Sequence, residues 1–172
     1  ENNPYPRWRY GSYFIESRQN IGSAINSEIS PNFIDVNSIL PSKFMPNILI
    51  AGCGTGQQIL DASRYKNSNI TAIDISAKSI AYAQRKANEY GLDNVSFIQM
   101  DILDLPLLNK GFDLIECSGV LHHMDSPMKG LQSLADSTNE KGFIKLGLYS
   151  EIARKDIAKA REIISNKRIE ES

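Results

Sequence analysis

The stretch Ile48–Gln57 reads ILIAGCGTGQ, a short apolar run followed by three glycines in five residues. The run ILIA is typical of a buried strand, because it is apolar throughout and too short for a buried helix. The glycines carry no β-carbon, so the turn that follows can reverse sharply and approach a ligand closely. A strand that leads through such a turn into a helix predicts a ligand site at the carboxyl end of a parallel sheet.

The same alternation of short apolar runs and amphipathic segments continues after this stretch. Ser76 is the predicted N-cap of a long helix, and Gly91 follows the end of that helix. Strands that alternate with helices favour βαβ units, so we expect a doubly wound, Rossmann-like α/β domain with a parallel sheet of about five strands. Further strands are predicted at Ile70–Ile75, Val95–Met100, Phe112–Cys117 and Gly142–Leu148, and helices at Gln57–Tyr65, Ala77–Tyr90 and Pro127–Ser137.

Length and composition are those of one globular domain. The chain has 172 residues, of which 41% are hydrophobic and 23% are charged. A net charge of −1 creates no long-range field, which disfavours nucleic acid and anionic membranes as partners. No apolar run is long enough to span a bilayer. Cys53 and Cys117 form no spaced framework, so we expect free thiols and a cytoplasmic location.

Acidic residues end the second and third predicted strands. Asp74 lies 22 residues after Gly52, where a carboxylate can accept hydrogen bonds from both hydroxyls of a ribose. Asp101 closes the third strand in the same way and can accept a hydrogen bond from an adenine amino group. For both residues, a simple capping role at the end of the strand stays open. The sequence thus predicts a nucleoside site above the first three strands.

The glycine turn does not match the phosphate-binding patterns. A dinucleotide fingerprint needs glycine at position 57, where this chain has Gln57, and the third glycine comes one residue early at Gly56. No Gly-Lys-Ser/Thr follows, so the loop of nucleoside triphosphatases is absent as well. The expected nucleoside therefore carries no phosphates over this turn.

Four segments together resemble the consecutive motifs of the class I S-adenosylmethionine (SAM)-dependent methyltransferases. The resemblance covers about Asn47 to Ser150 and implies SAM as cofactor. It also implies methyl transfer to a small-molecule or protein acceptor. The segment NPYPRW, Asn3–Trp8, is similar to one that precedes methyltransferase domains in larger bacterial proteins, some of which contain helical repeats. The four segments are Ile48–Gln57, Thr71–Ser76, Phe97–Ile102 and Phe112–Met124.

The resemblance implies a cofactor-binding role for residues at the ends of the first four strands. The glycine turn would line the methionine part of SAM, Asp74 would bind the ribose, and Ile75 would pack on the adenine. The third strand would hold the other side of the adenine, and the fourth would end beside the sulfonium and the amino-acid group. The remaining implied residues are Gly52, Cys53, Gly54, Thr55 and Gly56 in the turn, Asp101 and Ile102, and Cys117 and Ser118.

His122 and His123, in the stretch GVLHHM, are the two histidines of the chain. Either one can act as a general base where the acceptor must lose a proton, and a structural role in the loop stays open. The resemblance does not identify the acceptor, because this motif occurs in methyltransferases with different acceptors. No cluster of His, Cys and Asp has the spacing of metal ligands, so we predict no metal site.

Three regions are expected along the chain. Residues 1–46 form an N-terminal cap and connector, with a helix over Tyr13–Ser27. The resemblance implies that Arg7, Trp8 or Tyr13 closes over the cofactor as a lid, and a core or surface-anchor role for Trp8 stays open. Residues 47–150 form the SAM-binding domain, and residues 151–172 contain an amphipathic helix over Glu151–Arg168. The sheet of the resembled family has seven strands and five are found here. We therefore expect the start of a truncated region after residue 150 and an edge position for the fifth strand, and the alternative of a minimal domain stays open.

Two other functions stay open. A SAM-binding, non-catalytic domain of a larger protein would share every cofactor motif, and only turnover separates it from an enzyme. A nicotinamide-binding oxidoreductase domain would place Asp74 on a dinucleotide's ribose and would bind NADH but not SAM.

Overall fold

The computed structural model describes residues 21–28, 36–39, 45–150, 152, 155–156 and 159. The expected lid and most of the expected helix Glu151–Arg168 lie outside these residues and stay predictions. Helix α2 (Ile21–Glu28) overlaps the predicted helix Tyr13–Ser27, and a short helix α3 (Val36–Ile39) follows it. Within the described part of the chain, no helix combines the length and the apolar content that a membrane crossing needs.

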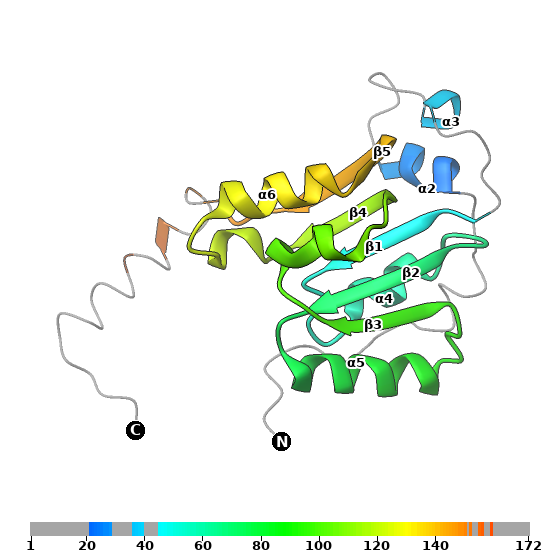
Figure 1. The fold of residues 1–172 in the computed structure, drawn as a ribbon, viewed down its shortest axis with the longest axis horizontal. Helices are drawn as coiled ribbons and strands as arrows, with labels where there is room; N and C mark the ends of the chain where they lie inside the picture. The colour runs from blue at the N-terminus through cyan, green and yellow to red at the C-terminus, as the bar shows by residue number, and fades with distance from the viewer. Residues whose placement is uncertain are drawn as a thin grey trace.

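Five parallel strands form one sheet in the order β3-β2-β1-β4-β5 (Figure 1). The order reverses at β1, so the point where ligands bind in doubly wound sheets lies between β1 and β4. This arrangement confirms the predicted doubly wound α/β fold, and among the described residues the fifth strand lies at an edge of the sheet, as expected. The strands are β1 (Asn47–Ala51), β2 (Asn69–Asp74), β3 (Val95–Gln99), β4 (Phe112–Ser118) and β5 (Thr138–Gly147).

Three α-helices and two 3₁₀ helices connect the strands. Ser76 caps α5 as predicted, because its side chain accepts a hydrogen bond from the amide of Ser79 at 3.3 Å. The first predicted helix is three residues too long, since the chain leaves α4 after Ala62 and turns so that Tyr65 is buried. The elements are α4 (Gln57–Ala62), α5 (Ala77–Glu89), η1 (Ile102–Leu108), η2 (Leu121–His123) and α6 (Pro127–Asp136).

The sheet separates two apolar layers. In β1, Ile48 and Ile50 face the layer of α4 and α5, whereas Leu49 and Ala51 face the layer of η1, η2 and α6. This alternation follows from the pleat, which points successive side chains to opposite faces. All four side chains are fully buried, so β1 is apolar on both faces and lies at the centre of the domain.

Strand β5 begins four residues before its predicted start at Gly142. Thr138 pairs with Phe112, but the next pairs are Leu114 with Phe143 and onward, so the register shifts between these positions. The stretch Thr138–Lys141 (TNEK) has no apolar alternation, and sequence period therefore gave no sign of a strand there. This stretch is a strand because its backbone pairs with β4.

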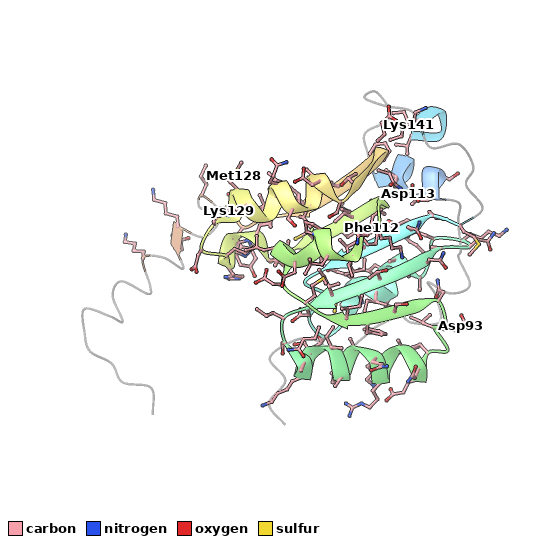
Figure 2. All side chains as sticks on the ribbon, viewed as in Figure 1. Asp93, Phe112, Asp113, Met128, Lys129 and Lys141 are labelled. Carbon is pink, nitrogen blue, oxygen red and sulfur yellow. The ribbon has the colours of Figure 1, made fainter. Side chains whose placement is uncertain are left out.

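A buried carboxylate holds the amino ends of three strands together. Asp113 Oδ2 accepts a hydrogen bond from the amide of Asn47 at 2.9 Å, and Oδ1 accepts one from Asn139 Nδ2 at 2.8 Å. Figure 2 shows Asp113 at the end of the domain opposite to Met128 and Lys129. These two hydrogen bonds therefore connect β1, β4 and β5 at the end of the sheet opposite to the cavity.

Candidate functional site

A cavity of about 1020 Å³ lies at the carboxyl ends of the strands. The loops after β1, β2, β3 and β4 and the segment after β5 all contribute to it, as expected at the reversal of strand order. Its volume is at the upper end of the range for small-molecule sites, about 300–1,000 Å³. The sequence-predicted residues that line it are Gly52, Cys53, Gly54, Thr55, Asp74, Ile75, Asp101, Ile102, Ser118 and His123.

The amides of the glycine turn are engaged within the protein. Those of Gly52 and Cys53 both donate to the carbonyl of Ile73 at 2.9 Å, and that of Gly56 donates to the carbonyl of Cys53 at 2.8 Å. The amide of Gly54 donates to Asp74 Oδ2 at 2.8 Å. Amides used in this way do not form a cradle for phosphate, which agrees with the missing dinucleotide pattern.

Asp74 connects the first two loops of the site. Its Oδ2 accepts from the amide of Gly54 and its Oδ1 accepts from the amide of Ser76, both at 2.8 Å. Each carboxylate oxygen has a second lone pair, so the group can still accept two hydrogen bonds from a ligand. The cap role and the ribose role, kept as alternatives for Asp74, are therefore compatible.

Two glycines expose bare backbone at the cavity. Gly54 after β1 and Gly119 after β4 both have positive φ, +52° and +76°, and both line the cavity. A β-carbon built on either one would meet no protein atom within 4 Å. The space in front of these two loops therefore belongs to the cavity, where a ligand can approach the backbone directly.

Asp101 acts as a cap and also faces the cavity. Its Oδ1 accepts a hydrogen bond from the amide of Leu103 at 2.9 Å and so starts η1. Near it, Ile75 is 69% exposed and Leu103 is 45% exposed, and both line the cavity. Exposed apolar side chains beside a carboxylate fit a flat, largely apolar ring that carries an amino group.

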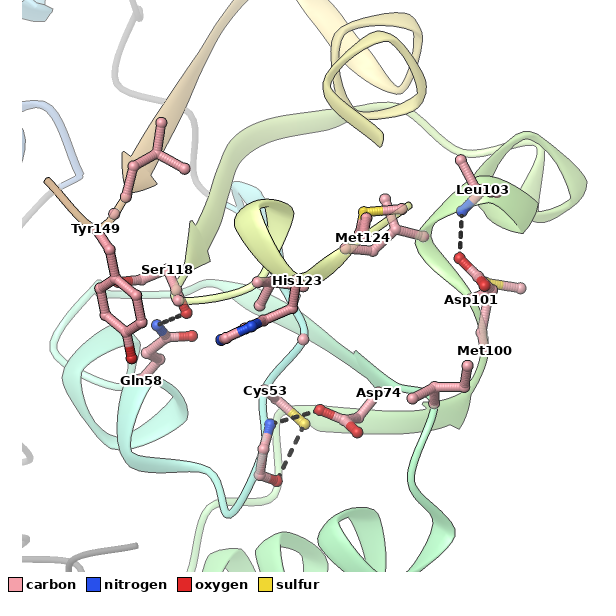
Figure 3. A pocket seen from close by; sticks show the side chains of 18 of the residues that line it. Cys53, Gln58, Asp74, Met100, Asp101, Leu103, Ser118, His123, Met124 and Tyr149 are labelled. Carbon is pink, nitrogen blue, oxygen red and sulfur yellow. Dashed lines mark hydrogen bonds between the residues drawn. The ribbon is translucent and has the colours of Figure 1, made fainter. Parts of the chain in front are cut away.

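The two histidines take different positions. His123 is exposed and lines the cavity, and Figure 3 shows its ring pointing into it. His122 does not line the cavity, and its ring lies 4.2 Å from that of His123 and 4.0 Å from that of Tyr149. Of the two predicted candidates, His123 alone lines the cavity, and His122 packs against its ring.

Two other predicted residues, Gly56 and Cys117, lie near the cavity but do not line it. Gly56 is the N-cap of α4 with φ +95°, so it shapes the turn. Cys117 is buried in the layer of η1 and α6, one residue before Ser118. Neither it nor Cys53 is in a disulfide, as predicted.

Burial keeps both thiols neutral. It raises the pKa of Cys53 to about 12, and the nearby Asp74 carboxylate acts in the same direction. Burial likewise raises the pKa of Cys117 to about 11. Cys53 therefore lines the cavity as a small apolar group and not as a thiolate nucleophile.

Some lining residues carry no signal in the sequence pattern. Gln58 projects from α4, Lys129 from α6, and Tyr149 from the segment after β5. Each belongs to an ordinary helix or loop sequence, and only the tertiary fold brings it to the cavity. Met100 and Leu103 also line the cavity. The one signal in the sequence for these two residues is their closeness to Asp101, which was predicted.

A family model described as "Methyltransferase domain" matches residues 48–142, which include β2, β3 and β4, all of β1 except its first residue, and the beginning of β5. The chain belongs to the class I SAM-dependent methyltransferases. SAM is the cofactor that membership of this family implies. Within the described residues of this methyltransferase domain, no group of three or more His, Cys, Asp or Glu side chains is arranged to hold a metal ion.

Two curated relatives illustrate the range of proteins that share the domain. An uncharacterized protein of Synechococcus sp. is 40% identical over 128 residues, which are 73% of this chain and 30% of the relative. A tRNA U34 carboxymethyltransferase of Campylobacter fetus is 29% identical over 137 residues, 78% of this chain and 46% of the relative. The methyltransferase domain thus spans less than half the length of either relative.

Solved structures share the fold of the methyltransferase domain. PKMT2 from Rickettsia typhi, in complex with AdoHcy, superposes with a TM-score of 0.64 at 23% identity and covers 80% of this chain and 29% of that one. The [4+2]-cyclase SpnF superposes with a TM-score of 0.56 at 28% identity, over 64% of this chain and 41% of its own. The same fold therefore occurs in proteins named for different reactions.

Proposed function

We propose that this domain binds SAM in the cavity and transfers its methyl group to an acceptor that enters beside His123. The observation that carries the proposal is the order of groups along the cavity (Figure 3). Asp101 and Leu103 lie at one end, Asp74 and Cys53 lie in the middle, and Gln58 and Ser118 lie at the other end. A ligand made of adenine, ribose and an amino acid has its groups in the same order.

Each cofactor-binding residue has a physical task in this proposal. Asp74 accepts hydrogen bonds from the ribose hydroxyls through the lone pairs that the loop amides leave open. Ile75 and Leu103 cover the faces of the adenine, and Asp101 accepts a hydrogen bond from its amino group. The bare backbone at Gly54 and Gly119 supports the fit, because it leaves room for a chain that passes close to both loops.

The chemistry asks little of the protein. When SAM is bound, its sulfonium already activates the methyl group for transfer. The residues of this chain have to hold the acceptor in line and keep water away, and correct placement supplies much of the rate. His123 is positioned to take a proton from an acceptor that must lose one.

We propose a small molecule or a protein side chain as the acceptor. The net charge of −1 supports this choice over a nucleic acid, which is bound mainly through many phosphate contacts. The tRNA-directed name of one relative favours the other choice, so RNA is the acceptor class to test against. Transfer of methyl to tRNA by this chain alone would overturn the proposal.

One other candidate function deserves a test. A domain that binds SAM without turnover would use the same cofactor residues, so binding alone does not separate it from an enzyme. The cyclase among the structural neighbours supports only the point that this fold also occurs in a protein named for a reaction other than methyl transfer. Release of demethylated product in the presence of an acceptor mixture would exclude a non-catalytic domain. Binding without any turnover would favour it.

Isothermal titration of the purified chain with SAM, with S-adenosylhomocysteine (SAH) and with NADH tests the cofactor assignment. We expect binding of SAM and SAH and none of NADH. Binding of NADH but not of SAM would support the oxidoreductase hypothesis instead. If the chain binds none of the three, the proposed cofactor site is refuted.

A further inference from the structure

The side chain of Gln58 reaches the cavity with half of its amide unpaired. Its Nε2 donates to the carbonyl oxygen of Ser118 at 3.5 Å, which is long for a hydrogen bond. Its Oε1 is shielded from solvent and accepts no hydrogen bond from the residues that the structure describes. Buried polar atoms are nearly always paired, so this oxygen requires an explanation.

The wall beside Gln58 presents two acceptor oxygens to the cavity, Gln58 Oε1 and the carbonyl of Ser118. Gln58 Oε1 accepts no hydrogen bond from the described residues, and the Ser118 carbonyl accepts a long one from Gln58 Nε2. A ligand group that complements them must donate at least two hydrogen bonds. A primary ammonium has three donors and a positive charge, which strengthens its bonds to carbonyl oxygens.

The position of Gln58 and Ser118 in the cavity indicates which end of the ligand lies beside them. Figure 3 shows Gln58 and Ser118 on the side of the cavity opposite to Asp101, with Asp74 between the two sides. With the nucleoside held by Asp74 and Asp101, the part of the ligand that reaches Gln58 is the one beyond the ribose. In SAM that part ends in an amino acid with an α-ammonium.

We propose that Gln58 is a specificity residue for the amino-acid end of the cofactor, with Gln58 Oε1 and the Ser118 carbonyl accepting hydrogen bonds from the α-ammonium. This inference rests on the proposed SAM site and extends it. Gln58 then discriminates among adenosine derivatives by the group at the far end of the molecule, because a ligand without the ammonium leaves Oε1 without a partner.

A competing explanation is a buried water that bonds to Gln58 Oε1. A water of this kind requires two to four polar partners and would serve every adenosine derivative alike. The two explanations differ in one measurable quantity, the ratio between the affinities for ligands with and without the amino acid.

The test uses isothermal titration with SAH and with 5′-methylthioadenosine, which has the same nucleoside and sulfur but no amino acid. In Gln58→Leu, we expect SAH affinity to fall roughly tenfold or more, the effect of losing a hydrogen bond to a charged group. Affinity for 5′-methylthioadenosine should stay within about twofold of wild type, which also shows that the variant is folded. Equal losses for both ligands, or no loss, would overturn the inference.

Two further variants sharpen the test. Gln58→Glu keeps an acceptor oxygen at the same place, so it should retain the preference for SAH, and loss of that preference would contradict the inference. Gln132→Leu is the matched control, because Gln132 is exposed on α6 and donates to Asp136 Oδ1 at 2.7 Å away from the cavity. It should bind both ligands as wild type does.

Failure of the inference and failure of the proposed function are distinguishable. If the wild-type chain binds neither SAH nor 5′-methylthioadenosine, the SAM site is refuted. If the wild-type chain binds both ligands and Gln58→Leu keeps the wild-type ratio, the SAM site stands and only the role of Gln58 is refuted.

Discussion

Tyr65 Oη donates a hydrogen bond of 3.0 Å to Glu116 Oε1, which ties the turn after α4 to the central part of β4. Both side chains are almost fully buried, at 2% and 5% exposure. Arg64 Nη2 in turn donates to Tyr65 Oη at 3.3 Å. A buried carboxyl next to a phenol is sensitive to pH, because its ionisation is opposed by burial.

The first prediction concerns the stability of this pair. Burial raises the pKa of Glu116 above its ordinary value of 4.5, and Asp61 acts in the same direction, while Lys145, Tyr65 and Arg64 oppose it. The folded state therefore holds the proton more tightly than the unfolded state. Stability from this group is fully present below pH 4.5 and is lost as the pH rises through the raised pKa.

Denaturant unfolding at a series of pH values checks this prediction. In Glu116→Gln, which still offers an oxygen to Tyr65, the free energy of unfolding should decline less steeply above pH 4.5 than in wild type. Some decline should remain, because burial also raises the pKa of Asp61. The exposed Glu140→Gln is the control, and an identical pH profile for Glu116→Gln and wild type would contradict the assignment.

The second prediction concerns Asp74. Asp74→Ala removes the acceptor of the Gly54 and Ser76 amides, so we expect a loss of about 1–3 kcal/mol in the free energy of unfolding. SAH binding should weaken in addition, by about 1.5–3 kcal/mol for each charge-assisted hydrogen bond lost to the ribose. Calorimetry on the same sample gives both values. An unchanged affinity would refute the ribose position, and the exposed Asp104→Ala should change neither quantity.

The third prediction separates strain from ligand contact at a glycine. Gly54→Ala forces a β-carbon into a left-handed conformation, at a loss of about 1–2 kcal/mol, and points it into the cavity. Gly91→Ala has the same positive φ and open surroundings at the end of α5, away from the cavity. We expect similar losses of stability in both and weaker SAH binding in Gly54→Ala alone. Equal SAH affinity in the two variants would argue against a ligand at this loop.

The fourth prediction concerns the thiols. With raised pKa values of about 12 for Cys53 and about 11 for Cys117, both should react slowly with a thiol-specific disulfide reagent at pH 8 in the folded protein. Both should react promptly after unfolding. SAH should slow Cys53 further, since this residue lines the cavity. Rapid labelling of Cys53 in the native state would show that its surroundings are more open than described.

Sequence pattern predicted four of the five strands to within one residue at each end. β1, β2, β3 and β4 each contain a short apolar run, whereas the first four residues of β5 contain none. The 3₁₀ helices η1 and η2 were not predicted, since η1 contains Pro106 and η2 is three residues long. Short elements of this kind are formed by tertiary contacts and leave no period in the sequence.

For the candidate site, the sequence predicted the loops that follow the strands. It did not predict the side chains that reach the cavity from α4, from α6 and from the segment after β5. Asp74 and Asp101 follow directly from their positions at strand ends. The choice between His122 and His123 did not, because neighbouring residues on a loop differ only in the direction that the backbone gives them. Gln58 and Tyr149 reach the cavity from α4 and from beyond β5, and their types are common on any surface.

The two amide hydrogen bonds on the Asp74 carboxylate also bear on the thermodynamics of association. They hold the rotamer of Asp74 in the structure without a ligand, so the proposed nucleoside would meet an acceptor that has already lost its conformational entropy in folding. The site at this point is preorganised. Recognition there then resembles rigid docking, with the entropy loss confined to the incoming molecule.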